Sequence, residues 1–126
     1  MKIEEQVLNM SQVQKLIELG FNVRKHSSIF YAPNWVIKWG EYEIQDYELV
    51  IGELREEDID CIPTLTIGDI IDILPTKIDE FILNTNRKYV AYDSKTTNLF
   101  YAYKSRFIDS LFDCLVWCIK QKHIEL

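Results

Sequence analysis

The sequence is short of the residues on which most catalytic motifs depend. Its 126 residues include only four glycines, three prolines and two histidines. It contains no G-x-S-x-G nucleophile elbow, no Walker loop, no Rossmann glycine pattern and no H-E-x-x-H zinc motif. We therefore expect no catalytic residues and no cofactor, although a small enzyme with an unrecognised site stays open as a third hypothesis.

Cysteine is also scarce, with three residues in the chain. An odd number leaves at least one thiol unpaired, and Cys114 and Cys118 lie one helical turn apart. Zinc normally takes four ligands, and beside these two cysteines and His123 no second pair stands at ligand spacing. We expect three free thiols, two of them buried on a helix, and no metal.

The chain lacks a hydrophobic run long enough for a membrane span. Its N-terminal segment "MKIEEQVLNM" has neither the basic start nor the apolar stretch of a signal peptide. Hydrophobic residues make up 48% and aromatic residues 13% of the chain, which is too apolar for intrinsic disorder. These features predict one folded domain over residues 1–126, in the cytoplasm and away from membranes.

The formal net charge of −6 is unevenly placed along the chain. Between Glu41 and Glu80, thirteen acidic residues stand against Arg55 and Lys77. The segment from residue 87 to residue 106 has five basic residues against Asp93 alone. The two regions either face each other within one fold or serve a partner.

Capping signals predict two short helices. The first follows Asn9 or Ser11, each of which has a glutamine three residues later, and it stops at Gly20. The second follows Thr66, which has an aspartate three residues later, and runs from about Ile67 to Leu74 with apolar residues at helical spacing.

Alternating apolar residues predict two or three strands between residues 29 and 53, and the runs "DEFILNT", "KYVAYD" and "LFYAYK" predict an antiparallel meander. The longest helix is expected in residues 106–123, with an apolar face made by Ile108, Leu111, Phe112, Leu115, Cys118 and Ile119. The fold class is therefore α+β, with an antiparallel sheet of about five strands packed against the C-terminal helix.

The stretch "REEDIDCIPTLTIGDIIDILP" combines six acidic residues with a cysteine and two prolines. It fails as a calcium loop because Pro63 stands where an EF-hand needs glycine. Its acids are expected either in a solvated loop before a helix or on a surface that binds a protein.

Trp117 lies on the side of the C-terminal helix opposite Leu115, towards Asp109 and Asp113. Either the helix has a second contact, for example with the N-terminal helix, or the ring belongs to a protein-binding surface. The predicted protein-interaction surface comprises Trp117, Asp113, Asp109, Glu56, Glu57, Asp58 and Asp60.

The basic region offers an alternative site, because rings and cations together typically bind single-stranded nucleic acid. The net charge of −6 and the absence of an RRM motif oppose this hypothesis, so nucleic acid is the less favoured partner. The residues of this alternative surface are Arg87, Lys88, Tyr89, Tyr101, Tyr103, Lys104 and Arg106.

Three segments, "VLNMSQVQKLIELGF", "IPTLTIGDIIDILP" and "FIDSLFDCLVWCI", carry a family likeness. Together they resemble small uncharacterised proteins encoded by gut anaerobic bacteria and their phages or integrated elements, a family of unknown function. The resemblance implies a bacterial or mobile-element origin and a shared fold, and it assigns no site residue. Our favoured hypothesis is a non-catalytic accessory or adaptor protein that binds another protein or itself.

Overall fold

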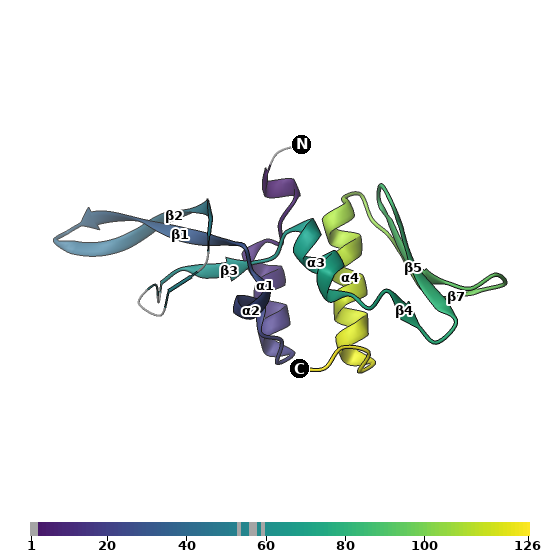
Figure 1. Ribbon diagram of the computed structural model, residues 1–126. Helices are drawn as coiled ribbons and strands as arrows, with labels where there is room; N and C mark the ends of the chain where they lie inside the picture. The colour runs from purple at the N-terminus through teal and green to yellow at the C-terminus, as the bar shows by residue number, and fades with distance from the viewer. Residues whose placement is uncertain (1–2, 53, 56–57, 59) are drawn as a thin grey trace.

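The computed structural model describes residues 3–52, 54–55, 58 and 60–126, and its architecture is α+β (Figure 1). In chain order the elements are η1 (Ile3–Glu5), α1 (Met10–Glu18), α2 (Val23–His26), β1 (Ile29–Lys38), β2 (Glu41–Ile51), β3 (Ile62–Thr64), α3 (Ile67–Ile73), β4 (Lys77–Ile78), β5 (Phe81–Asn86), β6 (Tyr89–Asp93), β7 (Asn98–Tyr103) and α4 (Phe107–Lys120).

The predicted fold class is confirmed, but the single sheet of about five strands is wrong. The described residues form two antiparallel sheets, one of three strands in the order β2-β1-β3 and one of four in the order β4-β5-β6-β7. Helices α3 and α4 lie between them (Figure 1). The strands are therefore divided between two sides of a helical layer, which local sequence patterns do not reveal.

Both predicted short helices begin with a capping box, and of the two candidate caps for the first helix, Asn9 and Ser11, the structure has Asn9. Asn9 caps α1 and exchanges hydrogen bonds with Gln12, and Thr66 caps α3 and exchanges them with Asp69. Gly20 has a φ of 86° just after α1, in the left-handed region where glycine is favoured. These helix boundaries follow from short-range hydrogen bonds, which is why the sequence predicts them.

Helix α4 is buried along most of its length and contacts elements on two sides. Cys118 Sγ lies 3.8 Å from the Tyr92 hydroxyl of β6, while Asp109 Oδ1 accepts a hydrogen bond from Gln12 Nε2 of α1. The core around this helix is apolar and comprises Leu8, Val13, Leu16, Phe21, Val23, Leu65, Ile70, Leu74, Ile78, Val90, Tyr92, Ile108, Leu111, Cys114, Leu115, Cys118 and Ile119.

The part of the β2-β1-β3 sheet nearest the helices is fixed to this core, because side chains of β1 and β3 donate hydrogen bonds to the same backbone carbonyl. The Leu8 carbonyl accepts hydrogen bonds from Thr64 Oγ1 at 2.7 Å and from the Tyr31 hydroxyl at 2.9 Å. Ser28, just before β1, donates to both carboxylate oxygens of Asp69. Beyond this part of the sheet, β1 and β2 continue as a hairpin that extends away from the helices (Figure 1).

In the described part of the chain, none of the helices is both long and apolar enough to cross a membrane.

Candidate interaction surfaces

The outer part of the β1–β2 hairpin is a two-stranded ribbon, and we call residues 32–48 the arm. Its strands are joined by a two-residue turn, Trp39 and Gly40, whose φ angles are 54° and 80°. Two positive φ angles in succession define a type I′ turn, which favours Asn-Gly or Asp-Gly. A tryptophan is thus placed where local conformation prefers a small polar residue.

A bulge in β2 sorts the side chains of the arm onto two faces. Trp35 pairs with Ile44 whereas Asn34 pairs with Asp46, so Gln45 is the extra residue in β2. Since directly paired residues share a face and successive residues alternate, this insertion reverses the alternation of β2 at one point. Every acidic residue of the arm consequently lies on the face opposite Trp35.

The apolar face of the arm is open to solvent. Its side chains are Trp35, Ile37, Tyr42 and Ile44, with exposed fractions of 48%, 65%, 74% and 37%, and Trp39 at the turn is 100% exposed. Contiguous exposed apolar side chains of this kind mark interaction sites in soluble proteins.

The other face of the arm is acidic. It carries Glu41, Glu43, Asp46 and Glu48 of β2, opposed by one cation, Lys38 of β1. The arm is therefore an amphipathic ribbon with aromatic and aliphatic groups on one side and carboxylates on the other.

A second surface lies on the outer face of the β5–β7 sheet. The tyrosine platform, as we call it, consists of Tyr89, Tyr101 and Tyr103 with Asn84, Asn86, Arg87 and Lys88, and these seven residues line an open groove of about 540 Å³. The opposite face of the same strands, with Val90, Tyr92 and Ala102, is buried.

Tyr89 is held in place at the centre of the platform. Its ring meets the Tyr101 ring edge-on, with centroids 5.0 Å apart, and its hydroxyl donates to Asp93 Oδ2 at 2.7 Å. The hydrogen bond to this carboxylate raises the pKa of Tyr89 to about 12. The phenol therefore stays protonated at neutral pH and the ring orientation is fixed.

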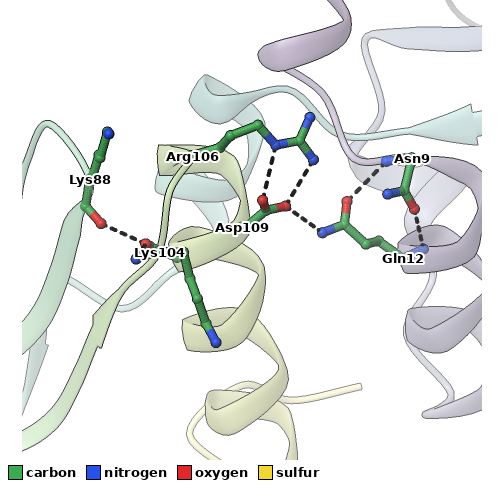
Figure 2. A network of polar contacts seen from close by, with 7 residues as sticks. Asn9, Gln12, Lys88, Lys104, Arg106 and Asp109 are labelled. Carbon is green, nitrogen blue, oxygen red and sulfur yellow. Dashed lines mark hydrogen bonds and ion pairs between the residues drawn. The ribbon is translucent and has the colours of Figure 1, made fainter.

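The groove of the platform gathers five of the seven residues predicted for nucleic-acid binding, while the cationic groups of the other two pair with acids of α4. Lys104 Nζ lies 3.4 Å from Asp113 Oδ2, and Arg106 binds Asp109 through Nε and Nη2 at 3.0 and 3.1 Å (Figure 2). Two cations of the basic region are thus paired with two acids of the predicted protein-interaction surface.

Asp109 belongs to a chain of polar contacts that joins α4 to α1 (Figure 2). It accepts from Arg106 and also from Gln12 Nε2 at 2.9 Å. Burial opposes ionisation of this carboxyl, but the hydrogen bonds from Arg106 and Gln12 outweigh it and hold its pKa below the usual range. Its contacts are those of a structural group that orients the start of α4.

Trp117 is half-buried against the second sheet. Its ring centroid lies 5.0 Å from that of Phe100, 6.0 Å from that of Tyr92 and 5.1 Å from that of His123. The second contact foreseen for α4 is therefore with the sheet. Whether Trp117 also binds a partner stays a prediction.

The remaining predicted acids lie in the segment before β3. Asp58 Oδ2 accepts a hydrogen bond from the backbone amide of Arg55 at 3.0 Å, and Asp60 is exposed. Glu56 and Glu57 fall outside the described residues.

The cysteines are free thiols, with Cys114 and Cys118 buried. A hydrogen bond with Cys118, together with burial, raises the pKa of Cys114, so this thiol stays protonated. Within the described ranges, no three histidine, cysteine, aspartate or glutamate side chains gather as metal ligands would.

The arm is the surface that the sequence hypotheses did not single out. Its alternation predicts strands, but alternating patterns usually indicate that the apolar side is buried. The overlooked signal is Trp39 directly before Gly40, because an aromatic residue in a tight hairpin turn does not assist folding.

Comparisons of the chain with protein-family models, with curated proteins and with solved structures find no match. The resemblance to proteins of gut bacteria and their mobile elements therefore stays a prediction.

Proposed function

We propose that this protein is a non-catalytic accessory or adaptor protein, of bacterial or mobile-element origin, that binds another protein through the arm. The observation that carries this proposal is Trp39, fully exposed at the tip of the arm with a φ of 54°. A left-handed conformation costs an ordinary residue about 1 kcal/mol or more. An exposed ring gains no burial within the chain that offsets this cost, so its benefit is expected in a complex.

The composition of the arm supports the same conclusion. Tryptophan and tyrosine are enriched among the residues that dominate binding energy at protein interfaces. Trp35, Trp39 and Tyr42 lie on or next to one apolar face, which projects from the fold and is accessible to a large partner. The carboxylates on the opposite face keep the free ribbon soluble and disfavour non-specific aggregation.

Photo-crosslinking tests the proposal. A benzoylphenylalanine at position 39, in the full chain produced in bacterial cells, is expected to form a discrete adduct with a second polypeptide. The same group at Gln14, an exposed position of α1, is the control and is expected to form none. Adducts that are equal at both positions, or absent at position 39, would contradict a binding role for the arm.

Single-stranded nucleic acid at the tyrosine platform is a second candidate function. The observation that favours it is the gathering of Tyr89, Tyr101, Tyr103, Arg87 and Lys88 around one groove. Rings that stack on bases and cations that follow a phosphate backbone bind single strands with little sequence preference.

Fluorescence anisotropy with labelled oligonucleotides tests this candidate. If it is right, binding at low salt weakens as salt rises, and Tyr101→Ala with Tyr103→Ala lowers the affinity by about tenfold or more, since each stacked base contributes roughly 1–3 kcal/mol. Tyr42→Ala on the arm is the matched control and should leave the affinity unchanged. A flat anisotropy at high protein concentration excludes this function.

A further inference from the structure

We propose that the partner of the arm is a second copy of this chain, in which the arm lies on the tyrosine platform. This inference rests on the proposed function of the arm and adds the identity of the partner. It joins two exposed surfaces of the described chain that are opposite in charge and both rich in aromatic side chains.

The two surfaces do not meet within one molecule. The arm extends from one side of the helical layer, and the β5–β7 sheet lies on the other side (Figure 1). The question raised by the uneven charge of the sequence is thus answered in part, because the carboxylates of the arm do not face the platform of their own chain. Contact between them requires another copy.

Charge favours this contact. The arm has four carboxylates against one lysine, whereas the platform has Arg87 and Lys88 at its edge, in the turn between β5 and β6. Neither cation has an ion pair within the described residues, unlike Lys104 and Arg106, which are neutralised on α4. Opposite potentials of this kind steer two surfaces together and set their orientation.

The apolar groups are complementary as well. Trp35, Ile37 and Tyr42 project from one face of the ribbon. Tyr101 and Tyr103 are 53% and 62% exposed and flank the groove of the platform. Tyrosine and tryptophan pairs gain about 0.5–1.5 kcal/mol beyond their buried area. With the apolar face of the arm on the platform, its carboxylates lie on the outer, solvated side of the ribbon, where they act on the approach of the two surfaces by long-range attraction rather than by direct ion pairs.

The arrangement of the surfaces also predicts a closed assembly. The arm and the platform lie on opposite sides of the molecule (Figure 1). We therefore expect two copies side by side in antiparallel orientation, so that each arm reaches the platform of the other. Such a two-fold pair satisfies both contacts and leaves neither surface open, and two-fold dimers are the commonest oligomers.

Sedimentation of mixed variants tests the inference. The arm variant carries Ile37→Thr and Trp39→Asn, and the platform variant carries Lys88→Glu and Tyr103→Thr. Threonine keeps strand propensity, and asparagine suits the positive φ of Trp39, so both variants are expected to fold. At low salt the wild-type chain should pass from 15.0 kDa towards twice that mass as its concentration rises.

Each variant alone is expected to dimerise at least tenfold more weakly, because neither of its two contacts is intact. An equimolar mixture should recover part of the association, since the arm of the platform variant meets the platform of the arm variant and one of the two contacts is then intact. The control is a charge reversal at the exposed Lys25 of α2, Lys25→Glu, which should leave dimerisation unchanged.

Two results would overturn the inference. Wild-type chains that stay monomeric at every concentration exclude self-association, while an adduct between position 39 and a different protein would leave the proposed function intact. Association that is lost in the arm variant but kept in the platform variant would mean that the arms contact each other and not the platform. If either variant misfolds by circular dichroism, Trp35→Thr with Tyr42→Thr replaces the arm variant, and Arg87→Asn with Tyr101→Thr replaces the platform variant.

Discussion

Replacing Trp117 by alanine should lower the free energy of unfolding by about 3 kcal/mol, the lower part of the range for removing a packed aromatic side chain. The ring contacts Tyr92, Phe100 and His123, so its removal opens a gap between α4 and the second sheet. Urea denaturation followed by circular dichroism measures the effect. Trp39→Asn is the matched control, because it removes an exposed tryptophan that packs on nothing in the described chain, and it should leave the midpoint unchanged or raised.

The comparison of the two tryptophans separates packing from binding. From the sequence, Trp117 is the candidate for a protein contact, whereas in the fold Trp39 is the more exposed ring. We expect Trp117→Ala to reduce stability and Trp39→Asn to reduce association. The opposite result, a Trp117→Ala chain of wild-type stability that no longer associates, would favour the sequence-based hypothesis that Trp117 belongs to a protein-binding surface.

Ser110→Ala should cost about 2–3 kcal/mol, a large effect for the loss of one oxygen atom. The buried hydroxyl donates to the Lys88 carbonyl at 2.6 Å and accepts from the Lys104 amide at 2.9 Å (Figure 2). Without the hydroxyl, the Lys88 carbonyl and the Lys104 amide lose their hydrogen-bond partner, and each unsatisfied buried group costs about 1–3 kcal/mol. Denaturation by urea measures the loss, and Ser105→Ala, at an exposed serine, is the control.

Hydrogen exchange gives this prediction a local readout. Ser110 ties the turn that holds Lys88 and the end of β7 to α4, and these segments form one end of the tyrosine platform. In Ser110→Ala the Lys104 amide should exchange faster than in wild type, while amides in the middle of α1 change only with global stability. Unchanged protection of Lys104 would show that water or a shifted backbone replaces the hydroxyl.

Stability and binding are assigned to different parts of this fold. Trp117, Ser110 and Asp109 hold α4 against its neighbours, and their replacement is expected to affect folding first. The arm and the outer face of the platform contribute little to the core, so we expect substitutions there to leave the fold intact. Variants at these surfaces are therefore suitable for testing function without disturbing the structure.

The sequence by itself determines the longer local elements of this protein, whereas the short elements η1, α2, β3 and β4 are not among those it predicts. The capping boxes at Asn9 and Thr66, the stop at Gly20 and the long apolar C-terminal helix are all predicted correctly, because each depends on residues within a few positions of one another. The order of helical and alternating patterns along the chain likewise predicts the α+β class. These features follow from hydrogen bonds and turn preferences that operate over one or two helical turns.

Only the tertiary structure decides how the strands are divided and which side chains stay exposed. The alternation in the arm and in β5–β7 is visible in the sequence, but its apolar side faces solvent in the arm and is buried against α4 in β6. The single-residue bulge at Gln45 and the pairing of Lys104 and Arg106 with acids of α4 add to this outcome. Exposure and long-range pairing depend on how elements pack against each other, and a pattern within one segment does not contain that information.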